Sequence, residues 1–279
     1  MSATEVVFVI AAPLILLALA RLVLQWVLGS SLRVALTDHD NPAMGLAVAG
    51  YLFGVIWTIT VLLGTPSRGL WQDVVDVALY GGLGIVLLTV MSLVSCRLFL
   101  GLHVREQLEA HNSSAAVVVA GSYVATSLTY SGALSGEGGG FLMLLLFFVL
   151  GQLALLVMTY VFRWLTGYDD VEQIGSGNLA AGVAQAGLLI AMGIVVGQAA
   201  SGDFTTLEDS LLGFGISLLV VVVFYPVRQL VVQCLILGAP IRFRSILLDN
   251  EIAEDKNIAA GLLEASAYLS TALFITSVI

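Results

Sequence analysis

The amino-acid sequence predicts an all-α, polytopic membrane protein with eight transmembrane helices in four repeated hairpins. Composition is the first observation behind this prediction: 59% of the 279 residues are hydrophobic, 10% are charged, and the mean hydropathy is +1.04. Soluble domains typically contain about 25% charged residues. The second observation is a series of apolar runs of about 20 residues, the length of a helix that crosses a bilayer. The third is a motif that occurs four times.

The repeated motif begins with Asn and places small residues at fixed distances after it. Its clearest copy covers residues 178–187, and the other copies cover 41–50, 112–121 and 257–266. Each copy has Gly or Ala four residues after the Asn, Ala eight residues after it, and Gly or Ser directly after that Ala. Asn is a preferred helix N-cap, and small residues four apart let two helix backbones approach closely in lipid. Four transmembrane helices are therefore predicted to start at Asn41, Asn112, Asn178 and Asn257.

The eight predicted spans alternate between helices without and with this motif. The odd-numbered helices are expected at about 6–28, 74–100, 141–164 and 210–238, and the even-numbered helices at 41–64, 112–134, 178–200 and 257–279. The charged connection 101–111 is predicted to be helical. Residues 246–248 are apolar among charges and predict a short interfacial helix. Residues 30–40 and 166–177 are interpreted as polar connections.

Two further predictions concern domains and packing. The Gly-rich stretch 135–140 is expected to be a flexible linker between a first four-helix transmembrane domain, residues 1–134, and a second one, residues 141–279. The even helices carry the small-residue seams, so they are expected at the centre of the fold. The odd helices carry bulky apolar runs that suit lipid, such as residues 144–148, and are expected at the rim.

Basic residues set the predicted orientation. Of the ten Lys and Arg residues, only Arg68 lies on the side opposite the Asn connections. Because cytoplasmic loops are rich in Lys and Arg, the Asn connections are predicted to be cytoplasmic and both termini extracytoplasmic. The first apolar run has Glu5 and no basic residue before it, so it is interpreted as a membrane helix and not as a cleaved signal.

The four Asn residues and four arginines are candidate site residues. One Arg lies near the end of each odd helix, at Arg21, Arg97, Arg163 and Arg228. The simplest interpretation makes the asparagines helix caps and lets the arginines extend to the lipid headgroups. The functional alternative is that the four helix N-termini converge, with the arginines nearby, on an anion or ligand site.

Two polar residues are predicted to lie inside the membrane. Gln185 and Glu264 each follow the Asn of their repeat by seven residues. For Gln185 the expected role is an interhelical hydrogen bond. Glu264 is a functional candidate, because an intramembrane acid must be protonated or paired with a cation. Arg228 is the odd-helix arginine nearest to it in sequence and is the expected partner.

Motifs typical of enzymes are absent from the sequence: it has no GxSxG, no phosphate-binding P-loop and no GxGxxG after a strand. His39, His103 and His111 lie in connections without metal-ligand spacing. Cys96 and Cys234 are expected to be reduced core residues. The sequence therefore predicts no enzyme activity, no cofactor, no metal and no nucleic-acid partner.

A family resemblance rests on one stretch of the third repeat. Residues 166–170 read Thr-Gly-Tyr-Asp-Asp, Ile174 follows, and residues 177–181 read Gly-Asn-Leu-Ala-Ala. This pattern resembles the bacterial inner-membrane family called domain of unknown function 350, whose domain has four helices and two Asn-x-Ala-Ala hairpins. The chain resembles two such domains in tandem. The resemblance implies a multi-pass inner-membrane protein, and the family's frequent genetic proximity to membrane-stress proteins implies a role in envelope homeostasis.

Two functions follow as expectations. The leading one is a permease-like, channel-like or sensor module that moves or responds to a small charged solute, because an intramembrane acid is typical of such proteins. The alternative is a membrane scaffold that binds cytoplasmic partners through its Asn-side loops. Expected partners are the lipid bilayer, further copies of the chain, and cytoplasmic membrane-stress proteins.

Overall fold

The computed structural model describes residues 3–101, 103–136, 138–202, 204–240 and 246–278. These residues are overwhelmingly helical and contain no strand. They include eight helical spans long and apolar enough to cross a membrane: Thr4–Leu28, Pro42–Leu63, Leu70–Leu98, Ser113–Ser135, Gly140–Leu165, Leu179–Ala200, Leu207–Ile236 and Ile258–Val278. The chain is thus a multi-pass helical protein, as the sequence predicts.

The even-numbered spans are uninterrupted helices that each begin directly after a motif Asn. They are α2 (Pro42–Leu63), α6 (Ser113–Ser135), α9 (Leu179–Ala200) and α13 (Ile258–Val278). The Asn side chain accepts a hydrogen bond from a first-turn backbone N–H at each start, for example Asn41 from Met44 at 3.0 Å and Asn112 from Ala115 at 3.1 Å. These bonds fix where each helix begins, because they satisfy donors that have no partner inside the helix.

The odd-numbered spans are less regular. Two of them are continuous helices, α1 (Ala3–Leu28) and α7 (Gly140–Leu165). The second odd span is α3 (Leu70–Asp76), a π-helical segment η2 (Val77–Gly81) and α4 (Gly82–Leu100). The fourth is α10 (Leu207–Leu219), a 3₁₀ segment η3 (Val220–Val223), α11 (Phe224–Val227) and a long π-helical segment η4 (Arg228–Ile236). Pro226 lies in this span and lacks the N–H of a regular helix, which accounts for part of the irregularity.

Short helices precede the even spans on the Asn side. Helices α5 (Val104–Glu109) and α12 (Ile246–Ala253) are where the sequence predicts helical connections. Two elements were not expected: the π-helical η1 (Val34–Asp38) and α8 (Asp170–Gly175) lie in stretches interpreted as polar connections. Asp169 caps α8 by accepting from the N–H groups of Val171 and Glu172, so the polar residue begins this short helix.

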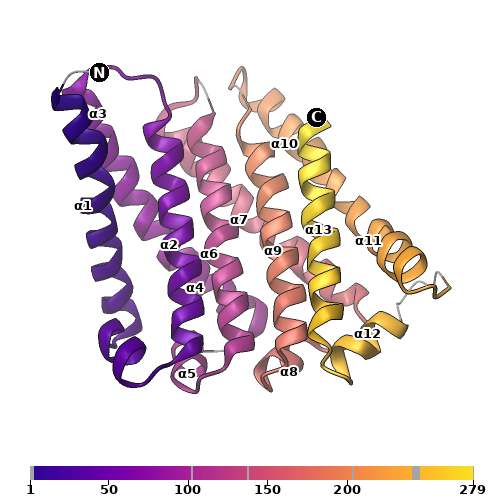
Figure 1. Cartoon of the computed structure of the whole chain (residues 1–279). Helices are drawn as coiled ribbons and strands as arrows, with labels where there is room; N and C mark the ends of the chain where they lie inside the picture. Colours follow the sequence, from indigo (N-terminus) through magenta and orange to yellow (C-terminus); the bar gives the residue numbers. More distant parts are fainter. Residues whose placement is uncertain (1–2, 102, 137, 203, 241–245, 279) are drawn as a thin grey trace.

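The four even helices lie side by side in one row, in the order α2, α6, α9, α13 (Figure 1). Glycines bring neighbouring backbones together: Gly50 of α2 faces Ala120 of α6, and Gly121 of α6 faces Ala186 of α9. A Cβ atom at either glycine would lie less than 3.0 Å from its partner. Close packing of small residues therefore joins successive repeats, including the two halves of the chain.

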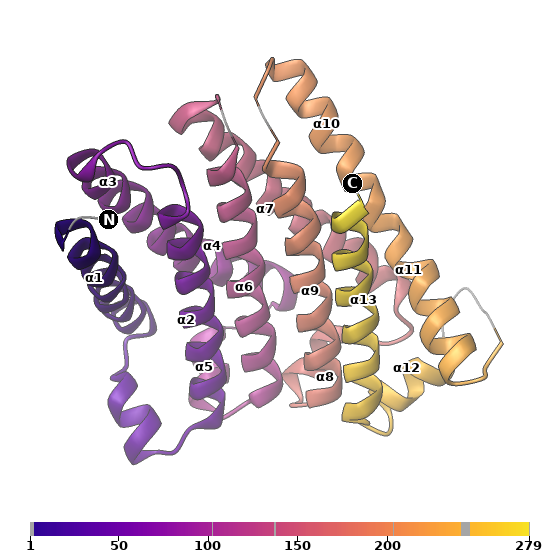
Figure 2. The same cartoon turned by 45° about the horizontal axis from the view of Figure 1, so that its top comes forward.

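The odd helices cover only one face of this row. Helix α4 packs against α2 and α6, α7 packs against α6 and α9, and α10 packs against α9 (Figure 2). On the opposite face, a groove of about 720 Å³ runs across the even helices and is lined by side chains such as Phe53, Leu128 and Ile194. The central position expected for the even helices is confirmed for α6 and α9, the most deeply buried spans. The odd helices do not surround them, however, because the even helices form a layer with one covered and one open face. Hydropathy could not show this, because lipid and packed protein are equally apolar environments.

Candidate functional site: a buried charge cluster in the fourth hairpin

Arg228 is the centre of a buried ionic cluster. It begins η4 and is 1% exposed, and Glu264 on α13 is 2% exposed. The Arg228 Nε donates to Glu264 Oε1 at 2.6 Å, and Nη2 donates to Glu264 Oε2 at 3.3 Å. Nη2 also donates to Asp249 Oδ1 at 2.5 Å. The expected pairing of Glu264 with Arg228 is thus present in the structure, and one guanidinium connects η4 to both α12 and α13.

The two carboxylates have further partners that extend the cluster. The Tyr268 hydroxyl, one turn after Glu264 on α13, donates to Glu264 Oε1 at 3.0 Å. The backbone N–H of Gly167 donates to Asp249 Oδ2 at 3.0 Å. Burial raises the pKa of Asp249, although the charge of Arg228 opposes this rise. The cluster therefore joins the fourth hairpin to the connection before α8 in the third.

A third carboxyl group, Asp170 at the start of α8, lies near the cluster. It is 3% exposed and accepts a hydrogen bond from Thr166 Oγ1 at 3.2 Å. Burial, followed by the negative charge of Glu264, raises the pKa of Asp170 to about 7. Asp170 and Asp249 each lie eight residues before the Asn of their own repeat, Asn178 and Asn257. The same repeat position thus supplies two buried acids.

Charge and hydrogen bonding are both unbalanced in this region. The guanidinium of Arg228 pairs with two carboxylates, those of Glu264 and Asp249, and the third buried acid, Asp170, lies near Glu264 and is influenced by the charge of Arg163. Within the described residues, Arg228 Nη1 and both amide atoms of the adjacent Gln229 are buried without a hydrogen-bond partner. Leaving a buried polar group unpaired costs about 1–3 kcal/mol, and such groups in native proteins commonly mark water, an ion or a ligand. The cluster therefore contains buried polar atoms that its own hydrogen bonds do not satisfy, as is typical of a binding or gating site.

The four motif asparagines do not converge on one point. Their helices start along the row, so the caps follow one another across the protein (Figure 1). In three repeats the Asn amide donates to a backbone carbonyl of the next repeat: Asn41 to Leu108 at 2.7 Å, Asn112 to Ile174 at 2.9 Å, and Asn178 to Ile252 at 2.7 Å. The alternative of a shared anion site at four helix N-termini is therefore wrong for this arrangement. We call this series of amide contacts the Asn relay.

The remaining predicted residues differ in their surroundings. Arg21 and Arg97 are exposed, and the Arg97 guanidinium lies 2.7 Å from a ring nitrogen of His103. Arg163 lies 3.7 Å from Asp169 and over the ring of Tyr160. The arginines are thus not equivalent, because only the last of the four is deeply buried.

Gln185 is 4% exposed on α9, as expected for a residue that faces protein. Its amide nitrogen nevertheless has no hydrogen-bond partner among the residues that the structure describes. The predicted interhelical hydrogen bond is therefore not made by this nitrogen.

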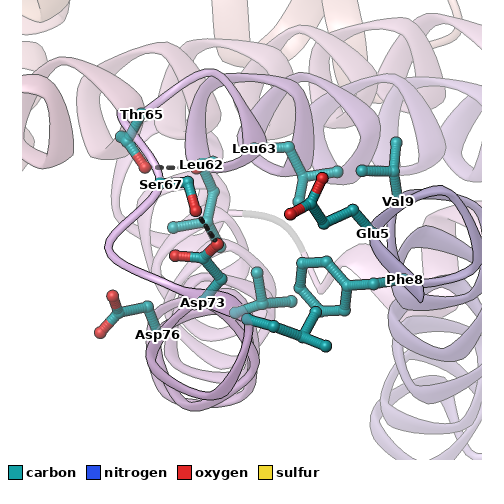
Figure 3. A pocket seen from close by; sticks show the side chains of 11 residues that line it. Glu5, Phe8, Val9, Leu62, Leu63, Thr65, Ser67, Asp73 and Asp76 are labelled. Atoms are coloured by element: carbon teal, nitrogen blue, oxygen red, sulfur yellow. Dashed lines mark hydrogen bonds between the residues drawn. The ribbon is translucent and has the colours of Figure 1, made fainter. Parts of the chain in front are cut away.

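A different acidic cavity lies at the opposite end of the spans. Figure 3 shows Glu5 of α1 and Asp73 and Asp76 of the second odd span around a cavity of about 220 Å³. Ser67 donates to Asp73 at 2.5 Å, and the backbone N–H of Arg68 donates to the same carboxylate at 3.0 Å. Arg68 also pairs with Asp76. The loop residues Ser67 and Arg68 therefore provide partners for Asp73 and Asp76.

Sequence reasoning missed Asp249, Asp170, Tyr268 and Gln229. The shared spacing of the two aspartates from their asparagines was a detectable signal, and Tyr268 lies one helical turn from Glu264. Nothing in the sequence indicated that Gln229 would be buried. The polar Gln229 is buried and its apolar neighbour Leu230 is exposed, which is the reverse of what their polarity suggests. The local spacing could have made the two aspartates and Tyr268 candidates. Only tertiary packing brings them close to Arg228 and Glu264.

The comparisons with known proteins agree with the repeated architecture. The family described as Domain of Unknown Function (DUF350) matches twice, over residues 2–134 and 137–279. No curated protein and no solved structure matches the chain. The two matches divide the eight spans into four and four, and together they cover nearly the whole sequence. The chain therefore belongs to the DUF350 family, as two tandem copies of its domain.

Proposed function

We propose that this protein is a permease-like or channel-like membrane module for a small charged solute, and that the Arg228 cluster is its proton-linked gate. The observation that carries the proposal is the buried guanidinium of Arg228, which pairs with Glu264 and Asp249 while its Nη1 has no partner among the described residues, with the buried Asp170 near Glu264. A structural ion pair alone would be expected to satisfy its buried donors. An excess of acids over one Arg favours a proton or a small cation as the charged species.

The backbone at Arg228 supports a moving part. The π-helical segment η4 covers Arg228–Ile236, and π-helical turns occur frequently at functional sites. Arg228 links this segment to α12 through Asp249 and to α13 through Glu264. Protonation of either carboxyl group weakens its attraction for the guanidinium. The fourth hairpin would then have two arrangements, with the ionic bonds closed or released.

A groove beside the cluster would provide room for this movement. It has a volume of about 480 Å³ and lies between η4 and α13, lined by residues that include Val227, Val231 and Leu263. Val227 is the neighbour of Arg228, and Leu263 is the neighbour of Glu264. Arg228 and Glu264 themselves are buried behind this lining. Rotation of the two helices by a fraction of a turn would bring the ions to the groove.

The test is ion flux into proteoliposomes that contain the purified protein, with proton, sodium and potassium gradients imposed in turn. The variant is Glu264→Gln, which keeps the side-chain size and an acceptor for Arg228 Nε and Tyr268 but removes the titratable charge. We expect at least a tenfold loss of flux. The matched control is Glu208→Gln, which makes the same substitution at an exposed position of the first turn of α10 and should leave the flux unchanged.

The outcomes separate transport from the rival function. A Glu264→Gln protein that elutes and melts like the unmodified chain and retains full flux would remove the gate from the proposal. Absence of flux of all three ions in the unmodified protein would overturn transport. The rival, a scaffold for cytoplasmic partners, is favoured by the charged side chains of both signs that α5 exposes, such as Arg105 and Glu109. A scaffold would retain partner binding in Glu264→Gln and lose it when those charges are neutralised.

A further inference from the structure

The row of even helices repeats one interface three times. At the interface of α6 with α9, residues 2, 9, 13 and 20 positions after Asn112 face residues 4, 8, 15 and 19 positions after Asn178, and the contact of position 9 with position 8 recurs at all three interfaces. We call the first set the outgoing stripe and the second set the incoming stripe. The contacts that define them are Ala180 with Gly261, Gly121 with Ala186, Ala125 with Gly193, and Gly132 with Gly197. The interface is directional, because different faces of each helix meet the preceding and the following neighbour.

The last described helix of the row, α13, has an outgoing stripe, and no helix among the described residues follows it in the row. On α13 this stripe consists of Ala259, Ser266, Ser270 and Ser277, and all four residues are exposed. All four are small, as are the corresponding residues of α6, which pack against α9. Elsewhere on α13, exposed positions carry bulky apolar side chains such as Leu262 and Leu273. The stripe thus retains the residues of a helix-packing surface at a place where no described helix packs against it.

The first helix of the row has the complementary surface. The incoming stripe of α2 consists of Gly45, Ala49, Ile56 and Thr60, of which the last three are exposed and Gly45 is half-buried. Ala49 corresponds to Ala120, Ala186 and Ala265, the residues that receive the glycines of the preceding helix within the chain. Ile56 is the one bulky member. The row therefore ends in an unused outgoing stripe at α13 and an unused incoming stripe at α2.

The Asn relay also stops at the start of α13. This is a second observation, separate from the small residues, that a contact with a following repeat is missing. Asn112 and Asn178 each donate both to a Gln of their own repeat and to a carbonyl of the next, Ile174 and Ile252 respectively. Asn257 is exposed, and among the described residues its amide is bonded only to Glu251 of its own repeat. Its own-repeat contact is thus present, and the contact to a following repeat is missing.

We propose that copies of this protein associate end to end in the membrane, with α13 of one copy packed against α2 of the next in the register used within the chain. The two helices lie slightly further apart than the neighbouring even helices of one chain, because Ser266 carries a Cβ where α2, α6 and α9 have Gly. In this arrangement the Asn257 amide donates to a backbone carbonyl at the end of η1 of the neighbour, the position that corresponds to Leu108 and Ile174. The contact joins two copies of the same membrane orientation, because all even helices run in one direction (Figure 1).

The contact is heterologous, so it closes into a ring or extends into a filament according to the rotation between copies. A second copy is the favoured occupant because the surface continues an interface that already exists three times in the chain. Small residues would otherwise face lipid tails, which gain little from them compared with larger side chains. The inference is independent of solute transport and of the Arg228 gate.

The test is disulfide crosslinking between two differently tagged chains expressed together, with Cys96 and Cys234 replaced by Ala and Ser. One chain carries Ala49→Cys and the other carries Ser266→Cys. Oxidation in native membranes should join the two tags, because a disulfide requires Cβ atoms about 3.5–4.5 Å apart. The matched control replaces Ser266→Cys by Leu262→Cys, which is exposed on the same helix one turn away but outside the stripe. We expect the control pair to give at least tenfold less product.

A chain that carries both Ala49→Cys and Ser266→Cys should form a ladder of crosslinked species that stops at the size of a closed ring or continues as for a filament. Independently, Ser266→Leu should reduce the particle mass in mild detergent to that of one chain while leaving the melting temperature within about 2 °C, because Ser266 is exposed in the single chain. Absence of the Ala49–Ser266 product overturns the proposal. So do equal yields from the Leu262 pair, or a product between two Ser266→Cys chains alone.

Discussion

Gly187→Ala gives a sharp test of the row of even helices, because two effects of opposite sign compete. Replacing Gly by Ala in an exposed helix interior stabilises the helix by about 0.5–1 kcal/mol, since Gly loses more conformational entropy on folding. At Gly187, however, a Cβ atom would lie 2.6 Å from the Cα of Ala265 on α13. Non-bonded carbon atoms prefer about 3.5–4.0 Å. The substitution therefore forces two backbones apart by roughly 1 Å.

The expected magnitude follows from these two terms. Overpacking a well-packed contact typically costs about 1–3 kcal/mol, and the higher values apply where backbone atoms must move. Subtracting the gain in helix propensity leaves a net loss of about 1–2 kcal/mol. For a chain of this size, 1 kcal/mol corresponds to about 2–4 °C in melting temperature. Gly187→Ala is thus expected to lower the melting temperature by about 2–8 °C.

The assay is thermal unfolding of the purified protein in one mild detergent, followed by intrinsic fluorescence at a fixed scan rate. Gly213→Ala is the matched control, because Gly213 is exposed inside α10 and a Cβ there meets nothing within 4 Å. The control should raise the melting temperature by about 1–4 °C. If Gly187→Ala raised the melting temperature as much as Gly213→Ala does, the close contact between α9 and α13 would be refuted.

Two further predictions concern orientation and pH. A cysteine introduced by Ser67→Cys should react with an impermeant thiol reagent in intact cells and one introduced by Ser176→Cys should not; the reverse pattern would contradict the orientation inferred from basic residues. The pKa of Asp170 is raised to about 7 in the folded protein, so the stability that its protonated form contributes is lost as the pH rises from about 4 to about 7. Asp170→Asn should therefore melt above the unmodified protein by a margin that widens up to about pH 7 and then stays constant, and a margin independent of pH would disprove the raised pKa.

The helical spans and their beginnings could be predicted from local sequence for a physical reason. Crossing a bilayer requires a long apolar helix, because backbone polar groups have no partners in lipid, and this requirement is visible in any single run of residues. Capping is equally local: Asn41 and the other motif asparagines contact N–H groups two or three residues away. The pairing of Glu264 with Arg228 was also within reach, because a buried acid at that depth needs a cation and few are available.

By itself the sequence determined the spans, the caps, the repeat and the small residues of the packing seams, since each depends on residues less than one helix apart. Tertiary structure alone decided that the even helices form a row with one face covered, that Asp249 pairs with the guanidinium of Arg228, and that Asp170 lies near Glu264. It also decided that the amides of Asn41, Asn112 and Asn178 contact the next repeat. The physical reason is that lipid and protein present equally apolar surroundings, so hydropathy does not distinguish a packed face from an open one, and only the meeting of distant segments does.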